Sequence, residues 1–333
     1  MLGKALAWLD RAAFRPESLH PDLILGIAFL PPLAAGLLWF RLPALLILAA
    51  AVGLGGIAHL AARLARLPVP TSPLLASLVA VALIGPGTDM PWVLVAAGAA
   101  AGLEVARASL LPGLKVQPGI VVYAGLLLAT RGALAQYLNT PELKPFPEPI
   151  TLWIRFFGGT AAPIDPVKLW VGNVAGPVFA TSLLALATSL AWLWYARRLS
   201  PAVLVGFALG ALLPIWLLEW NPWFHLDSGP AWFAAGIVLA DRRLLPAGWA
   251  ARALLGIAAG VIAVVLRGRG YGYGIEAVPV TVAGLQLLGG VIAGLVWLVA
   301  NARGEWRRLG RVRLREAQMR VVEPSTPPLS KAS

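Results

Sequence analysis

Apolar residues form long runs along most of the chain, and proline, glycine or charged residues separate these runs. Such runs predict helices that cross a membrane, because about 20 apolar residues span its hydrocarbon core. Two runs are short: one ends at Gly85-Pro86-Gly87 and the other follows Asp227-Ser228-Gly229-Pro230. Short spans in matching positions of two halves are typical of a site between repeats. The ten predicted spans are 22–40, 43–62, 72–86, 90–108, 119–138, 174–195, 201–219, 230–241, 250–266 and 277–300.

The composition also predicts an all-α polytopic membrane protein. Of the 333 residues, 59% are hydrophobic and 13% are charged, whereas soluble domains carry about 25% charged residues. So few charges cannot cover a soluble surface, which excludes a cytosolic enzyme, and the apolar content excludes a disordered chain. The chain has no cysteine. It therefore carries no disulfide, no thiolate metal site and no cysteine-bound iron–sulfur cluster of its own.

The basic residues indicate how the chain is oriented in the membrane. There are 27 basic and 15 acidic residues, which give a formal net charge of +12. Most arginines follow the even-numbered spans or lie in the C-terminal tail. By the positive-inside rule, both termini are predicted on the cytoplasmic side of a bacterial inner membrane. Because these arginines sit at span ends, they favour membrane lipid as a partner and argue against nucleic acid.

The order of features repeats along the chain, which predicts two five-helix halves. Thr71-Ser72-Pro73 precedes the short span of the first half, and Asp227-Ser228-Gly229-Pro230 precedes that of the second. An odd number of spans per half inverts the second half in the membrane. The proline-rich stretch between the halves cannot form a long helix and is expected outside. The predicted segments are an interfacial segment 1–21, a first repeat 22–138, an outer loop 139–170, a second repeat 171–300 and a basic cytoplasmic tail 301–333.

Polar residues within the predicted spans are few, and they are costly enough to indicate function. Glu104 lies in the fourth span three residues before Arg107, so both side chains share one helix face. This spacing predicts either a structural ion pair or a carboxylate on an ion path, and Asp241 is a second candidate for such a path. His225 lies among aromatic residues outside the membrane, as an interfacial anchor or a cofactor contact. The pattern predicts no catalytic residue and no metal site.

The most informative segment opens the sixth span. It reads Gly172-Asn173-Val174-Ala175-Gly176-Pro177-Val178-Phe179-Ala180-Thr181-Ser182, and by itself it predicts a helix start with Pro177 in the first turn. On these residues the chain resembles the D subunit of the Rnf electron-transport complex and the B subunit of the sodium-translocating NADH:quinone reductase. Those proteins have ten spans in two inverted repeats. They hold flavin mononucleotide through a phosphoester to the threonine of a Gly-Ser-x-Gly-Glu-Thr-Ser-like segment, onto which Thr181 falls.

The resemblance covers about residues 18–300 and includes further motifs of the second half. The stretch His225-Leu226-Asp227-Ser228-Gly229 resembles the family's His-Leu-x-Ser-Gly. Asp241 falls on the aspartate of an Ala-Thr-Asp-Pro segment, and Tyr273 and Glu276 fall near a Gly-Tyr-x-Glu-Gly loop.

The chain also departs from the family pattern beside the flavin threonine. Pro177 stands in place of the family's serine, and Phe179 and Ala180 stand in place of its glycine and glutamate.

The resemblance implies a non-autonomous subunit of a membrane oxidoreductase or translocase. A flavin would pass electrons between cofactors of other membrane and peripheral subunits, and Na⁺ or H⁺ movement would be coupled to that flow. Two alternatives stay open: a small-solute or ion transporter with Glu104 or Asp241 on its path, and a membrane scaffold without cofactor. The residues implied to contact flavin mononucleotide are Thr181, Ser182, Gly176, His225 and Ser228.

Overall fold

The computed structural model describes residues 19–67, 72–111, 113–157, 165–268 and 273–296, together with Pro16 and Val299. The predicted tail 301–333 lies outside these residues, and so does the predicted segment 1–21 apart from Pro16 and residues 19–21.

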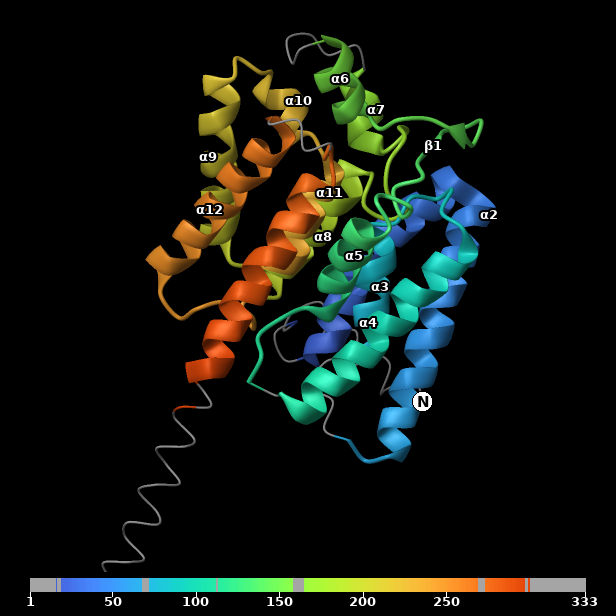
Figure 1. Ribbon diagram of the computed structural model, residues 1–333, viewed down its shortest axis with the longest axis vertical. Coiled ribbons are helices and arrows are strands. Elements are labelled where there is room, and N and C mark those ends of the chain that lie inside the picture. The colour runs from blue at the N-terminus through green and yellow to red at the C-terminus, as the bar shows by residue number, and fades with distance from the viewer. Residues whose placement is uncertain are drawn as a thin grey trace, which may run out of the picture.

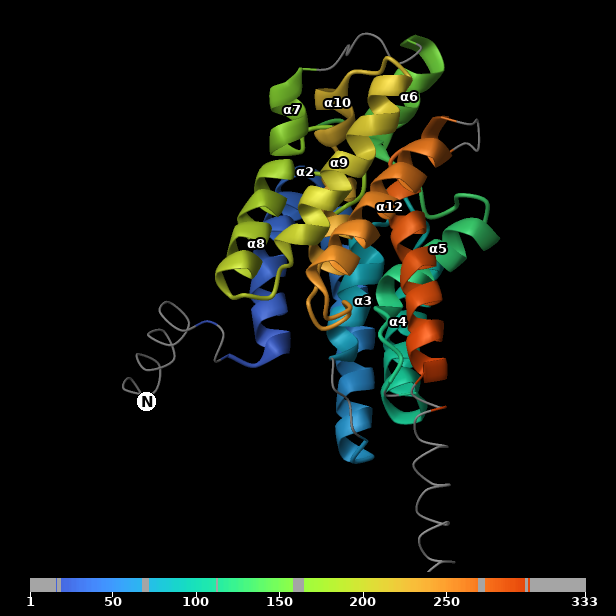
Figure 2. The same cartoon turned by 90° about the vertical axis from the view of Figure 1, so that its left-hand side faces the viewer.

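The first half of the chain contains four helical elements, and each has a proline within its first two positions (Figure 1). Proline suits the first turn of a helix, because its fixed φ is helical and its missing N–H would be unpaired there anyway. The first of these elements is interrupted at Arg41, where φ is 48° and ψ is −118°, so its two arms form a hairpin (Figure 2). The elements are α2 (Pro21–Leu64), α3 (Pro73–Ala82), α4 (Met90–Leu110) and α5 (Pro118–Ala129).

The connection between the halves holds short elements. Strands β1 (Leu138–Asn139) and β2 (Lys144–Pro145) pair in antiparallel fashion. Two short helices follow them, α6 (Pro149–Phe157) and α7 (Pro166–Val171). The predicted outer loop 139–170 therefore contains a small hairpin and two helices rather than one long helix.

The second half contains one irregular helix among regular ones. The helix α11 continues without a break as the π-helix η2, whose wider turns are rare and often occur at functional sites. The elements are α8 (Leu183–Tyr195), α9 (Pro201–Leu217), α10 (Pro222–Leu226), α11 (Gly229–Trp232), η2 (Phe233–Leu239), α12 (Trp249–Gly268) and a last helix Ala277–Val296.

The helices have the length and composition of a polytopic membrane protein. Within the described residues, four are long and apolar enough to cross a membrane: Pro21–Leu64, Met90–Leu110, Trp249–Gly268 and Ala277–Val296. The other predicted spans overlap shorter apolar helices or, at the start of the chain, the two arms of α2. The described residues are therefore mostly helical, as expected of a polytopic membrane protein, and the count of ten spans stays a prediction.

Two predicted spans were too long. The fifth was expected to reach residue 138, but α5 ends at Ala129, and Gly132 follows with φ at 92°. The sixth was expected to begin at residue 174, but α8 begins at Leu183. The backbone of residue 178 instead donates to the carbonyl of Ile84, at 2.8 Å, beyond the end of α3. Non-helical backbone from both halves thus meets at the end of a short helix.

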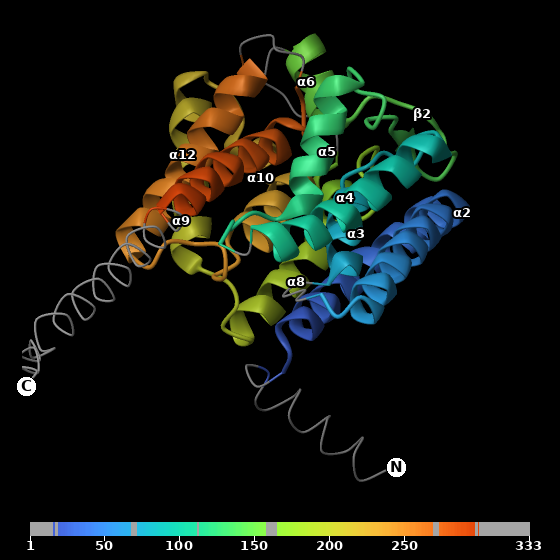
Figure 3. The ribbon, with the colours of Figure 1, turned by 60° about the horizontal axis from the view of Figure 1, so that its bottom comes forward.

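The connections lie at two opposite ends of the molecule. The α6, α7 and α10 helices lie at one end, called the upper end, and the α4–α5 connection and the end of the last helix lie at the other, the lower end (Figures 1 and 2). Seen from below, the first half lies on one side and α9, α12 and the last helix lie on the other, with α8 beside α2 (Figure 3).

Glycines allow α9 and α12 to pack with their backbones in contact. Gly206 and Gly210 are four residues apart on α9, and Gly256 and Gly260 are four apart on α12. A Cβ atom on any of the four would overlap a backbone carbonyl of the other helix. Small residues at this spacing are a common means of close helix packing in membranes.

Candidate functional site

Thr181 and Ser182 lie in non-helical backbone immediately before α8. The Thr181 hydroxyl donates to the carbonyl of Pro177. Ser182 caps the helix, because its hydroxyl accepts from the amide of Ala185 at 3.3 Å. Pro177 does not lie in the first turn of a helix, so that expectation was wrong. The run of small residues is used for an extended approach to α3 instead.

A small buried pocket at the upper end brings together three of the five expected flavin contacts. Gly176, Thr181 and Ser228 line it, with Glu148 and Asp227. Its volume is about 20 Å³. The Ser228 hydroxyl is buried and has no hydrogen-bond partner among the described residues, which leaves it available to a bound polar group.

Ser182 and His225 do not line this pocket. Ser182 faces the first arm of α2, on the other side of Thr181. His225 is 1% exposed and stacks between Trp220 and Trp153, with ring centroids 4.6 and 4.5 Å away. Burial, with a contribution from Arg267, lowers the pKa of His225 to about 2. The imidazole is therefore neutral, and within the described residues neither ring nitrogen has a hydrogen-bond partner.

The pocket fits a flavin mononucleotide only in part. Its two hydroxyls suit a phosphoester, whereas Glu148 and Asp227 also line it and would oppose a phosphate when ionised. A cavity of this size holds about one water molecule, whereas pockets for ligands of flavin size occupy about 300 Å³ or more. The isoalloxazine ring therefore has no place inside the pocket as the surrounding segments are arranged here.

A larger cavity of about 230 Å³ lies between the two halves toward the lower end. Glu104 from α4 and Asp241, just after η2, both line it, although they lie far apart in the sequence. The structure therefore brings together the two carboxylates that the sequence singled out for an ion path. Lys115 lines this cavity and also an adjoining cavity of about 280 Å³.

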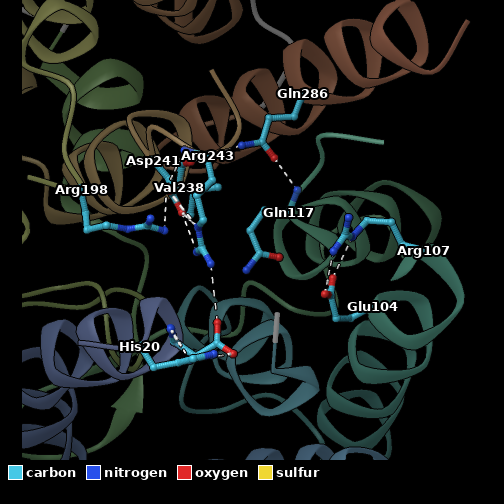
Figure 4. Close-up of polar contacts among 10 residues, drawn as sticks. His20, Glu104, Arg107, Gln117, Arg198, Val238, Asp241, Arg243 and Gln286 are labelled. Carbon is cyan, nitrogen blue, oxygen red and sulfur yellow. Dashed lines mark hydrogen bonds and ion pairs between the residues drawn. The ribbon is translucent and has the colours of Figure 1, made fainter. Parts of the chain in front are cut away.

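Glu104 forms the ion pair that its spacing from Arg107 predicts (Figure 4). The guanidinium donates to both carboxylate oxygens, at 2.9 and 2.8 Å, and also to the carbonyl of Leu114 at 3.1 Å. Glu104 is 1% exposed. A buried carboxylate of this kind needs its partner, because an unpaired charge in such a place is strongly unfavourable.

Asp241 is held by two arginines that the sequence analysis did not select (Figure 4). The Arg243 guanidinium donates twice to Oδ2, at 2.7 and 3.0 Å, and once to Oδ1 at 3.3 Å. Arg198 also donates to Oδ1, at 3.3 Å. A further contact of 3.6 Å joins Arg243 to Asp22 at the start of α2. Arg243 follows Asp241 by two residues outside a helix, so no helical spacing indicated this pair.

Two glutamines connect the wall of this cavity to the last helix: Gln117 lines the cavity, and Gln286 lines the adjoining one (Figure 4). The backbone amide of Gln117 donates to the side-chain oxygen of Gln286 at 2.9 Å. The Gln286 side-chain nitrogen in turn donates to the carbonyl of Val238 in η2 at 3.3 Å. Gln286 thus joins the start of α5 to the π-helix. An isolated glutamine within an apolar span was the only sequence signal for this residue.

Apolar helices of membrane length, with paired charges buried between the two halves, define a polytopic membrane protein with an internal polar cavity. The chain belongs to the NQR2, RnfD, RnfE family, whose model matches residues 22–283. No curated protein matches the chain. Family membership indicates a membrane subunit of an Rnf- or Nqr-type complex of several subunits, and complexes of this kind use flavins.

Proposed function

We propose that this chain is an electron-carrying subunit that holds flavin mononucleotide at Thr181 and couples electron flow to ion movement. The observation that carries the proposal is the meeting of the Thr181 and Ser228 hydroxyls in one buried pocket at the upper end. When bound, the flavin supplies one- and two-electron redox chemistry. The chain supplies the attachment atom, the shape of the pocket and the electrostatic surroundings.

Three residues of the pocket have a definite role in this proposal. Thr181 offers its hydroxyl oxygen for the phosphoester. Gly176 leaves space beside that hydroxyl, since a Cβ there would lie 3.2 Å from the Thr181 oxygen. Ser228 has an uncommitted hydroxyl that donates to a phosphate oxygen. Because the pocket is small, the segments around it have to open before the flavin is attached.

For the coupled ion, we propose the lower-end cavity as the entrance. Glu104 and Asp241 line it, and carboxylates are suitable groups for Na⁺ or H⁺. Both are paired with arginines. An ion therefore enters only when one of these pairs separates, and the arginines keep the cavity balanced in charge at other times.

The helix ends support two inverted halves, 22–138 and 171–300. Arg107 lies near the end of α4 and donates to the carbonyl seven residues later, Leu114, at 3.1 Å. Arg267 lies near the end of α12 and donates to the carbonyl seven residues later, Gly274, also at 3.1 Å. The first pair is at the lower end and the second at the upper end (Figure 1). We propose that the lower end, with its basic connections, faces the bacterial cytoplasm.

The test of the flavin proposal is the intact mass of the chain purified with its complex, combined with in-gel flavin fluorescence. We expect the mass to exceed that of the polypeptide by one flavin mononucleotide less water. Thr181→Val should remove both the added mass and the fluorescence. Thr188→Val is the matched control, because Thr188 lies on α8 and donates only to the carbonyl of Leu184. An unmodified mass, with no flavin released by acid, would refute the proposal.

A scaffold without cofactor is the second candidate, and the small volume of the Thr181 pocket favours it. Pro177, Phe179 and Ala180 point the same way, since they replace residues of the family's flavin segment. A scaffold would assemble normally as Thr181→Val and would contain no flavin. A transporter would also tolerate that change, but Glu104→Gln would alter its ion or solute flux. The mass, flavin content and flux together separate the three functions.

A further inference from the structure

Two buried carboxylates, neither of them assigned to flavin or to the ion path, accept from neighbouring amides at the upper end, and one of them, Glu148, also lines the Thr181 pocket. Glu148 is 2% exposed and Glu276 is 8% exposed. The amide of Gly274 donates to Glu276 at 3.0 Å, and the next amide, of Ile275, donates to Glu148 at 3.2 Å. Consecutive amides thus bind one carboxylate each, which places two acids of like charge together.

Glu148 also fixes the start of α6. Its oxygens accept from the amides of Ile150 and Thr151, at 2.6 and 2.7 Å, and from the Thr151 hydroxyl at 2.5 Å. The same side chain therefore caps α6 and binds the chain just before the last helix. Gly274 permits this contact, because a Cβ there would overlap the Glu148 carboxylate.

Within the described residues, the groups that face the pair supply one positive charge, that of Arg267. Arg267 on α12 is buried, and it donates to the carbonyls of Gly274 and His225 at 3.1 and 3.4 Å. His225 on α10 is neutral, for the reasons given above. Asp227 is half-buried and lines the same pocket as Glu148. Because it is a carboxylic acid, it adds no positive charge.

Two tyrosines extend the cluster from the other side. Tyr137 donates its hydroxyl to Glu276 at 2.7 Å, and Tyr123 on α5 hydrogen-bonds to Tyr137. Both tyrosines are buried. If both glutamates were ionised, the pair and Arg267 would carry an uncompensated negative charge in a buried place, which is unfavourable. One added positive charge balances the cluster.

We propose that Glu148 holds a bound proton beside the Glu276 carboxylate and so forms a proton-binding site at the upper end of the molecule. The proton removes the repulsion between the two acids and fastens α6 to the start of the last helix. When it leaves, Glu148 loosens from the Ile275 amide and residues 144–157 are held less tightly. The site rests on these contacts alone and does not depend on flavin at Thr181.

The electrostatics of the pair agree with this assignment. Burial, followed by the charge of Glu276, raises the pKa of Glu148 from 4.5 to about 7. That difference corresponds to a proton affinity about 300-fold above that of an ordinary glutamate. The hydrogen bonds from Thr151 and Ile150 act in the opposite direction and are outweighed.

The experiment is infrared difference spectroscopy of the full chain in its complex, titrated from acid to alkaline pH. We expect a protonated-carboxyl band that disappears with a midpoint near pH 7. Glu148→Gln should abolish that step, and Glu276→Gln should move its midpoint to lower pH by at least one unit, a tenfold change. Glu142→Gln is the matched control, because Glu142 lies in the same connection but is exposed and paired with Lys144.

A second measurement keeps the test decisive if a variant is poorly folded. Hydrogen exchange of residues 144–157 in the unmodified protein should become faster as the pH rises through 7, after correction for intrinsic rates, while α9 and α12 stay unchanged. A carboxyl band that persists in Glu148→Gln would overturn the proposal. So would hydrogen-exchange rates of residues 144–157 that do not change as the pH rises through 7. A midpoint that moves with Na⁺ at constant ionic strength would also overturn it, by assigning the site to a metal cation.

Discussion

Replacing Gly210 by alanine tests whether the close packing of α9 and α12 requires a residue without a Cβ atom at this position. The added Cβ would lie 2.7 Å from Cα of Ile257, and the carbonyl oxygen of Ile257 would be closer still. Ordinary contacts of a Cβ begin at 3.4 Å. The helices would therefore have to separate by at least 3.4 − 2.7 = 0.7 Å at this point. Neighbouring contacts at Gly206, Gly256 and Gly260 would open with it.

Two opposing effects set the magnitude. Alanine is favoured over glycine inside a helix by about 1 kcal/mol. Overpacking of a close contact costs about 1–3 kcal/mol, and here the atoms that must yield belong to backbone and not to a flexible side chain. Because the closest groups cannot rotate away, we expect the steric cost to dominate. The expected net loss of stability is up to about 2 kcal/mol.

The assay is the midpoint of thermal unfolding in detergent, compared with that of Gly102→Ala. Gly102 is a helical glycine on α4, and a Cβ there would meet no atom within 4 Å. We expect Gly210→Ala to lower the midpoint by a few degrees and Gly102→Ala to leave it unchanged or raise it. Equal midpoints for the two variants would show that the α9–α12 contact is not limited by backbone overlap.

Two further predictions concern buried charges and pH. Arg107→Gln should lower the free energy of unfolding by about 3–5 kcal/mol, because Glu104 would stay buried without its partner. Adding Glu104→Gln should restore most of the loss. An unfolding midpoint that does not change in the single variant would show that the pair does not stabilise the fold. The pKa of His225 is lowered to about 2 in the folded chain, so the unfolded chain binds an extra proton below pH 6.5. Stability should therefore fall as the pH drops below that value, by about 1.4 kcal/mol per unit from this group; His225→Phe should reduce the slope, and the exposed His20→Phe should not.

The helix starts could be predicted from the sequence to a large extent because proline fixes them locally. Pro21, Pro73, Pro118 and Pro201 each begin a helix close to the predicted boundary. For Pro177 the same reasoning gave a wrong helix start, because α8 begins only at Leu183. This proline is followed by backbone that hydrogen-bonds to residues beyond the end of α3, and no local signal specifies a partner from the other half of the chain.

The candidate sites also differ in how far the sequence could predict their contacts. The Glu104–Arg107 pair follows from helical spacing, so it could be predicted. The meeting of Glu104 and Asp241 in one cavity depends on how the halves pack, and the spacing of residues carried no sign of it. Glu148 was not selected at all, because it lies in a proline-rich connection and its partner Ile275 is 127 residues away.

The geometry of the π-helix η2 affects how the carboxylate of Asp241 is held. Its i→i+5 turns hold one residue more than an α-helix would over the same length. One residue of an α-helix corresponds to a rotation of about 100° and a rise of about 1.5 Å. If η2 tightened to α-helical geometry, that surplus residue would pass to one end and turn the chain beyond it. Asp241 follows η2 after Ala240 and forms a β-bridge to Leu199, so such a turn would break this bridge together with the pairs to Arg198 and Arg243. The irregular helix therefore stores one extra residue close to the carboxylate that we propose for the ion path.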